Sequence, residues 1–256
     1  MLFVVSLIPY LATAADNASS LVVEADESLQ WLQNDQQYIA IGNAVASKDD
    51  MIFRASKITA DYIDDNSSTA AESATGTTIT RMLGEGNSHF TRGETNSRAE
   101  IIDYDMVADI ITMKGSRIEV VSPQVKINAA ESLVYQRPKR LVTARGKAKV
   151  LMEDGRSIHG DTIIATLSED ESEVLTINAK GDVLVESAAP DNRSATANKA
   201  DYDIRSGLAL LEGDVTLFDG QSRLSGEKAR MDTASGVSTL ISPTKGKRVT
   251  GVIAGN

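Results

Sequence analysis

The stretch LALLEGDVTLFDGQSRLSGEKARMD, from Leu208 to Asp232, decides the fold. Between Ala209 and Leu217 its odd positions are all small or apolar, whereas its even positions are mixed. An alternation of period two places the two sets on opposite faces of a β-strand. Asp219-Gly220 predicts a turn, because Gly tolerates positive φ and Asp bonds nearby backbone. The stretch therefore predicts a β-hairpin, with a β-bulge at the step from Gly226 to Ala229, where the alternation of the second strand breaks.

The rest of the chain contains imperfect copies of this hairpin. The first strand of each copy carries a marker that consists of Gly, a small or polar residue, and a third residue that is often Val or Ala. The copies of the marker are Gly42-Asn43-Ala44, Gly86-Asn87-Ser88, Gly115-Ser116-Arg117, Gly146-Lys147-Ala148, Gly181-Asp182-Val183 and Gly213-Asp214-Val215. Their glycines are separated by 44, 29, 31, 35 and 32 residues. Repeats of this length bury their apolar face only by stacking, so the chain predicts an all-β, antiparallel protein with roughly 14 short strands.

The amino-acid composition limits the classes of function that the chain can have. The chain has 256 residues, of which 41% are apolar and only 4% aromatic, so the expected interior is large and aliphatic. The absence of cysteine excludes disulfides, thiol nucleophiles and cysteine zinc sites. A net charge of −10 disfavours binding to nucleic acid, because phosphate neutralisation dominates that affinity.

The chain begins with an apolar, uncharged segment, MLFVVSLIPYLATA, which covers residues 1–14. It is too short to span a bilayer comfortably and ends in an A-x-A site, so it predicts a cleaved secretory signal. Positive residues, which normally precede such a segment, are missing from this one. The alternative is a retained N-terminal membrane anchor.

Three polar segments predict connections between strands. The segment from Asp64 to Thr78 is small and polar without a period, so it is expected to form a loop. Gln136–Arg140 is basic and contains proline; it is expected to be a solvated turn or, alternatively, a patch that meets an anionic sugar or phosphate. Ser168–Glu173 is acidic and is expected to be a solvated turn.

No pattern of residues indicates catalysis. The two histidines, His89 and His159, fall on the outward phase of predicted strands in unrelated repeats, without metal-ligand spacing. Nucleophile-elbow, zinc-protease, phosphate-loop and dinucleotide motifs are missing from the sequence. The recurring carboxylates occupy one structural column rather than forming a special pair; they are Asp61, Asp105, Asp203 and Asp232. The sequence thus predicts a protein that is not an enzyme and holds no cofactor or metal.

With its repeat in view, the chain resembles the LptA/OstA family of periplasmic lipopolysaccharide transport proteins. The resemblance rests on Val23-Glu24-Ala25-Asp26, on the Gly-Asn/Asp-Val markers with partners such as Leu224 to Ala229, and on the closing Lys245-Gly246-Lys247-Arg248-Val249-Thr250. It covers about residues 21–253. It implies a folded-over antiparallel sheet, a β-jellyroll that is built from repeated hairpins and is open at both ends.

The resemblance also implies the function and the partners. An apolar trough would hold the acyl chains of lipid A in lipopolysaccharide, and copies of the protein would join head to tail in the periplasm. The chain of proteins would run from the inner-membrane component LptC to the outer-membrane translocon LptD. Open sheet edges suit such pairing, and we expect them at Leu21–Ala25 and Arg248–Ile253.

The apolar phase of the strands predicts which residues line the trough. They are Ile39, Ile41, Phe53, Ile58, Phe90, Ile102, Tyr104, Ile118, Val120, Leu133, Val150, Ile163, Val183, Val185, Leu211, Val215, Leu217 and Leu224. The phase is ambiguous near Gly42, where Ile39 and Ile41 oppose Ala40 and Ala44. It slips after Gly115, where Arg117 and Glu119 fall on the expected inner face.

Several alternatives remain open at this point. The chain is longer than a typical bridge protein of the family, so residues 15–256 form one extended jellyroll or two fused units at about 21–136 and 137–253. A membrane-anchored partner similar to LptC would need a retained N-terminal helix. An extracellular β-helical adhesin or polysaccharide-acting protein would show shorter coils stacked in parallel. A purely structural assembly protein would share the fold but have a dry core.

Overall fold

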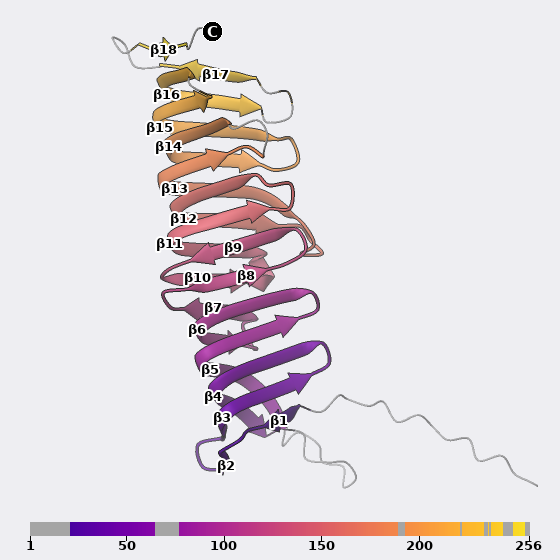
Figure 1. Ribbon diagram of the computed structural model, residues 1–256. Coiled ribbons are helices and arrows are strands. Elements are labelled where there is room, and N and C mark those ends of the chain that lie inside the picture. The colour runs from indigo at the N-terminus through magenta and orange to yellow at the C-terminus, as the bar shows by residue number, and fades with distance from the viewer. Residues whose placement is uncertain are drawn as a thin grey trace, which may run out of the picture.

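The computed structural model describes residues 21–64, 77–188, 193–220, 222–232, 235, 237–242 and 248–253. These residues form strands and one short 3₁₀ turn, stacked from the N-terminal to the C-terminal end (Figure 1). The elements are β1 (Val22–Glu24), β2 (Ser28–Leu32), β3 (Gln37–Lys48), β4 (Met51–Asp64), β5 (Thr77–Arg92), β6 (Thr95–Asp105), β7 (Ile110–Lys114), β8 (Ile118–Val121), β9 (Val125–Ala129), β10 (Ser132–Gln136), η1 (Arg137–Lys139), β11 (Leu141–Met152), β12 (Ser157–Leu167), β13 (Val174–Glu186), β14 (Arg193–Asp203), β15 (Leu208–Asp219), β16 (Ser222–Asp232), β17 (Ser238–Ile241) and β18 (Thr250–Val252).

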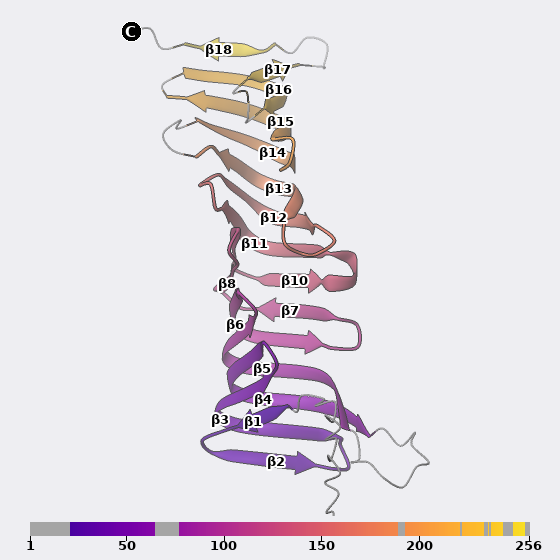
Figure 2. The same ribbon diagram turned by 90° about the vertical axis from the view of Figure 1, so that its right-hand side faces the viewer.

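Every recorded strand pairing is antiparallel, so the predicted all-β antiparallel class is confirmed and a parallel β-helix is excluded. The sheet folds over on itself, which Figure 2 shows from the side. We call its two sides the first wall and the second wall. The first wall contains β2, β7, β10 and β17 with the segments that pair with them, and the second wall contains β1, β8, β9 and β18 with theirs. Each long strand, such as β3, runs from one wall into the other.

The glycine markers form the corner between the walls. At the marker of β15, Glu212 pairs with Lys228 and Val215 with Gly226, so Gly213 and Asp214 together face one residue of β16. The predicted bulge is confirmed, and its extra residue lies on β15 rather than on β16. Both residues have positive φ, +81° and +48°. Gly adopts this region freely and Asp or Asn does so at modest cost, which explains the Gly-Asn/Asp pairs of the marker.

The same two-residue bulge recurs in four other strands, at Gly42-Asn43, Gly86-Asn87, Gly146-Lys147 and Gly181-Asp182. The Gly115 marker differs, because β7 ends at Lys114 and β8 begins at Ile118. The second strand of the same hairpin is also divided, into β9 and β10. These two breaks and the short strands at the ends explain why the described residues form 18 strands where about 14 were predicted. Both walls remain continuous, because β7 pairs with β10 and β8 pairs with β9.

Both ends of the stack are open among the described residues. At the N-terminal end β1 and β2 pair only with β3, and at the C-terminal end β17 and β18 pair only with β16. The predicted edges at Leu21–Ala25 and Arg248–Ile253 contain β1 and β18 and are confirmed. The sequence analysis did not assign β2 and β17 as edges, although they are the corresponding edges of the first wall.

Some predictions fall outside the described residues. These are the signal at residues 1–14 and most of the loop that begins at Asp64, since description resumes at Thr77. The basic segment Gln136–Arg140 forms the predicted connection between two strands, β10 and β11, and contains η1. Within the described part of the chain, no helix has the length and apolar character needed to cross a membrane.

Candidate functional site

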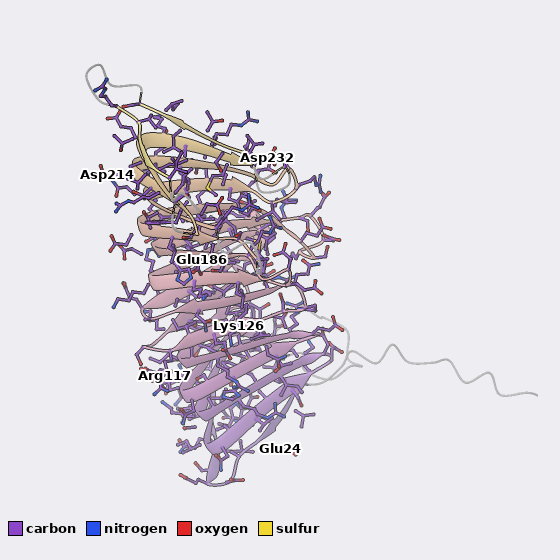
Figure 3. The ribbon with its side chains drawn as sticks, turned by 45° about the horizontal axis from the view of Figure 1, so that its top comes forward. Glu24, Arg117, Lys126, Glu186, Asp214 and Asp232 are labelled. Atoms are coloured by element: carbon purple, nitrogen blue, oxygen red, sulfur yellow. The ribbon has the colours of Figure 1, made fainter. Side chains whose placement is uncertain are left out.

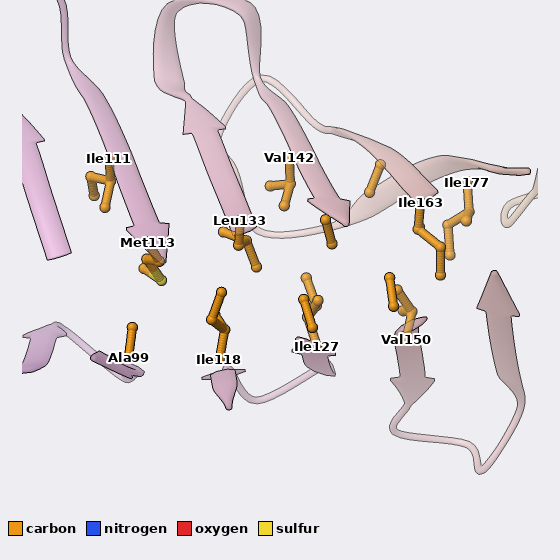
Figure 4. Packing of buried hydrophobic residues seen from close by; sticks show 14 of the residues in the cluster. Ala99, Ile111, Met113, Ile118, Ile127, Leu133, Val142, Val150, Ile163 and Ile177 are labelled. Atoms are coloured by element: carbon orange, nitrogen blue, oxygen red, sulfur yellow. The ribbon is translucent and has the colours of Figure 1, made fainter. Parts of the chain in front are cut away.

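The space between the two walls is apolar along the whole stack. Figure 4 shows how the walls meet at mid-length: Ala99, Ile118 and Ile127 of the second wall point toward Met113 and Leu133 of the first wall. The polar residues buried among the described ones are Ser88, Ser97, Ser157 and Thr216, and none of these is charged. Charged side chains such as Arg117 and Asp214 project from the outside (Figure 3). The acidic surface therefore encloses an uncharged interior.

Most of the predicted lining residues point into this interior. Val120 and Leu224 are half-buried and pack against the core. Ile118 is buried, so the break at Gly115–Arg117 restores the inward phase after the slip in the alternation. The buried members of the predicted set are Phe53, Ile58, Phe90, Ile102, Tyr104, Ile118, Leu133, Val150, Ile163, Val183, Val185, Leu211, Val215 and Leu217. Their inward orientation is confirmed, and their contact with lipid stays a prediction.

Ile41 was placed on the wrong face, whereas Ile39 lines the N-terminal cavity although its neighbour Ala40 is the fully inward residue. Ala40 pairs with Ile58 in the inward row and is 2% exposed, whereas Ile41 pairs with Lys57 on the outer face. Ile39 and Ile41 are half-buried and alternate with Ala40. The prediction chose the larger apolar residues, but from Ala40 onward the inward positions of β3 are held by small residues such as Ala44 and Ala46.

Alanines are the inward residues that the sequence analysis missed. Ala44, Ala46, Ala148 and Ala195 are completely buried, and many other alanines have little exposure. An alanine contributes little to an apolar pattern, so alternation alone did not single them out. The repeated Ala at the third marker position, as in Gly42-Asn43-Ala44, was the available signal.

The interior contains open space in two regions. One cavity of about 300 Å³ lies at mid-length between the margins of the walls, where Phe90, Met113, Ile127 and Val142 line it. A neighbouring cavity of about 470 Å³ shares Gln124, Val125, Val150, Glu173 and Val174 with it. A third cavity of about 270 Å³ lies at the N-terminal end, beside Leu21, Trp31 and Tyr38.

Charged residues rim the mid-length cavity. The Arg137 guanidinium donates two hydrogen bonds to Glu171, at 3.2 and 3.1 Å, and lies 3.4 Å from Asp109. Burial opposes the ionised form of Glu171, but the adjacent Tyr135 hydroxyl and Arg137 outweigh it and lower its pKa. Arg92 lines the cavity from the second wall. The basic and acidic segments of the sequence thus meet here rather than being separately solvated.

The recurring carboxylates are structural, as predicted. Asp105 accepts hydrogen bonds from the backbone of Val107 and Ala108, and Asp203 accepts one from Ser206. Asp232 accepts a bond from Ser235 in the same way, so these residues hold the turns that follow their strands. Asp61 instead accepts from Gln37. Among the residues that the structure describes, no group of three or more His, Cys, Asp or Glu is arranged to hold a metal ion.

The neighbours of His159 do not form a nucleophilic site. Ser157 is buried and its hydroxyl donates to Glu186 at 2.7 Å, while His159 Nε2 lies 3.3 Å from both groups. The hydrogen bond from Ser157 lowers the pKa of Glu186, more than burial raises it, which makes this carboxylate a weak general base. His159 is half-buried on the outer face rather than freely exposed.

His89 makes stability depend on pH. It lies on the outer face between Arg54 and Arg98. Partial loss of solvent around the imidazole, together with these two positive charges, lowers its pKa below 6.5. The unfolded chain then binds the proton more readily, so stability should rise as the pH increases toward 6.5 and stay level above it. His89→Gln should flatten this rise, which melting curves between pH 5 and pH 8 would measure. An equally steep rise in the variant would contradict this role.

Comparisons with known proteins identify the family of the chain. The family model described as LptA/(LptD N-terminal domain) LPS transport protein matches the chain twice, at residues 22–131 and 126–237. The chain also resembles a crystal structure of LptH from Pseudomonas aeruginosa, which is described as the LptA homologous periplasmic component of the lipopolysaccharide transport device. The two sequences are 16% identical and the TM-score is 0.45. The aligned region covers 51% of this chain and 95% of the LptH chain. A search of curated protein sequences gives no match. Because the family model covers most of its length, the chain belongs to the family of LptA and the LptD N-terminal domain.

Proposed function

We propose that this protein carries lipopolysaccharide through the periplasm, with the acyl chains of lipid A between the two walls. The observation that supports it most is the uninterrupted apolar interior, which opens into cavities at mid-length and at the N-terminal end. Burial of acyl chains there is favourable by about 0.8 kcal/mol per CH₂ group. The role requires binding and release rather than catalysis or a cofactor. The family description, which names lipopolysaccharide transport, points the same way.

The open ends suit assembly. In a head-to-tail pair of copies, β17 of one would meet β2 of the next, and β18 would meet β1, so that both walls continue across the junction. Exposed apolar side chains lie on these strands, among them Trp31 and Val252, which are 58% and 69% exposed. The terminal copies would offer the same edges to LptC at the inner membrane and to LptD at the outer membrane. An unpaired edge is otherwise an aggregation hazard.

We further propose that the chain comprises two fused units, at about 21–136 and 137–253. The two matches of the family model fall on similar ranges. The strands that are divided at the corner, β7–β8 and β9–β10, lie where the units would join. One copy would then cover about twice the length of a single-unit relative.

Val120 and Val121 provide a matched test of the lipid site. They are adjacent and identical, but Val120 pairs with Ile127 in the inward row, whereas Val121 pairs with Lys126 on the outer face. A photoreactive residue at Val120 should crosslink to lipopolysaccharide in cells, and the same residue at Val121 should not. Crosslinking at Val121 alone would place the lipid outside the walls, and crosslinking at neither, in folded and secreted protein, would favour a dry structural core.

Trp31 provides a test of assembly, because it is the only tryptophan of the chain and lies on the edge strand β2. Its fluorescence emission should shift to shorter wavelength as protein concentration rises, since pairing would bury the indole. Ile241→Lys, on the exposed edge β17, should suppress the shift by placing a charge in the junction. A shift that is independent of concentration, or unchanged in the variant, would argue against this junction.

A further inference from the structure

The mouth of the mid-length cavity is lined by charged side chains. Two arginines from different walls lie there, Arg92 at the end of β5 and Arg137 in η1, and the neighbouring cavity is likewise lined by Arg156 and Arg205. Between Arg92 and Arg137 lies the acidic connection Ser168–Glu173, of which Glu171, Ser172 and Glu173 also line the mid-length cavity. We call this connection the strap.

The strap is ordered by its own hydrogen bonds. Asp170 accepts hydrogen bonds from the hydroxyls of Ser168 and Ser172, at 2.6 and 2.8 Å, and these bonds lower its pKa to about 2. The backbone of Ser168 donates to Glu173 at 2.8 Å. A loop that is tied internally can move as one piece.

One residue connects the strap to the opposite turn. Arg137 binds Glu171 through two hydrogen bonds, and both side chains are largely buried, with 23% and 29% exposure. The other recorded ion pair of the strap joins Glu173 to Arg205 at 3.8 Å, where the arginine is 80% exposed and contributes little. The Arg137–Glu171 pair is therefore the best-buried ion pair of the strap among the described residues.

From this geometry we infer that Arg137 and Arg92 bind a phosphate group of the lipid, and that Glu171 occupies the same position in the lipid-free protein. This inference rests on the proposed function, because the acyl chains must enter the cavity for the phosphate to reach its mouth. A guanidinium binds carboxylate and phosphate with the same two-pronged geometry, so one ligand can replace the other. The strap then opens when lipid binds and closes when lipid leaves.

The charges of the mouth favour a phosphate only after this exchange. In the docked state Glu171 and Asp109 both face Arg137. Undocking removes the strap with its four carboxylates and leaves the two arginines opposite Asp109. A phosphate monoester carries about −1.5 to −2 charges at pH 7 and matches a pair of arginines. Arg92 has no recorded ion pair among the described residues, so it is available for this role.

Tyr135 provides a third group for the same ligand. Its hydroxyl is buried beside Arg137 and Glu171, where its interaction with Glu171 falls short of standard hydrogen-bond geometry. When Glu171 leaves, a phosphate oxygen at Arg137 would give the hydroxyl an acceptor in its place. Burial and the Glu171 carboxylate raise the pKa of Tyr135, so the hydroxyl keeps its proton for donation.

The test compares two ligands that share their acyl chains: bis-phosphorylated lipid A and its dephosphorylated form. The wild-type protein should bind the phosphorylated form about tenfold more tightly. Arg137→Gln should abolish this preference without changing affinity for the dephosphorylated lipid. Glu171→Gln should increase the preference, because it breaks the same ion pair but leaves Arg137 free. Arg140→Gln, in the same turn and exposed, is the control and should behave as wild type.

Other results would overturn the inference. If Arg137→Gln and Glu171→Gln weaken both lipids equally, the pair only stabilises the turn. If millimolar inorganic phosphate competes as well as the lipid phosphate does, the site recognises free phosphate instead. If wild-type protein binds neither lipid although it is folded, the proposed function itself fails, whereas equal binding of both lipids by wild type contradicts the phosphate site alone.

Discussion

Leu211→Ala should lower the melting temperature by about 5–15 °C, whereas Leu210→Ala should change it by about 2 °C or less. The two leucines are neighbours on β15, but Leu211 is 1% exposed between the walls and Leu210 is 45% exposed on the outer face. Removing a buried leucine costs about 2–5 kcal/mol, because apolar burial is lost and a cavity remains. A surface change costs within about 0.5 kcal/mol, and 1 kcal/mol corresponds to about 2–4 °C for a domain of this size.

Thermal unfolding followed by circular dichroism would measure both variants under identical conditions. Similar small shifts in the two variants would mean that the walls do not pack on each other at this point. Similar large shifts would mean that the outer face of β15 is covered in solution. The enlarged interior of Leu211→Ala would also offer room for a longer stretch of acyl chain, so lipid affinity in this variant should be at least preserved.

The sequence predicted the walls well because each strand repeats one local rule. In the stretch from Leu208 to Asp232, period-two alternation assigned Leu211, Val215 and Leu217 to the interior, and the Gly213-Asp214 pair marked the corner. Both signals depend on residues close together in the chain. They fail where the inward residues are small, as in β3, where Ala40 is inside and Ile41 faces outward.

The mouth of the mid-length cavity could not be predicted in the same way. Arg137 and Glu171 are 34 residues apart and lie in turns, where no periodic pattern reports which way a side chain points. The sequence showed a basic turn and an acidic turn, and each alone is most simply solvated. Only the stacking of β10 to β13 brings the two turns together at one margin of the first wall. Similarly, β2 and β17 are edge strands because each pairs with a neighbour on one side only. This depends on the arrangement of the whole sheet and not on the sequence of either segment.

Gly146→Ala should destabilise the protein by about 2–5 kcal/mol, and Gly220→Ala should cost only about 1–2 kcal/mol. Both glycines have positive φ, +84° and +58°, so an alanine is strained at either site by about 1–2 kcal/mol. They differ in what the new methyl group would meet. At Gly146 it would lie 2.8 Å from the backbone nitrogen of Glu131 and 3.0 Å from the carbonyl carbon of Ala130, whereas at Gly220 nothing lies within 4 Å.

The contact at Gly146 is with backbone, so it cannot be relieved by a side-chain rotation, and overpacking of this kind adds about 1–3 kcal/mol. The difference between the two variants therefore isolates the close approach of β11 to the break between β9 and β10, since the cost of positive φ is common to both. Urea unfolding curves would measure it as a difference in midpoint at equal slope. Equal destabilisation would show that the glycine is needed only for its backbone conformation. A larger loss at Gly146 would show that the corner also fixes the separation of the strands where the two proposed units join, which is the region that carries Arg137 and the mouth of the cavity.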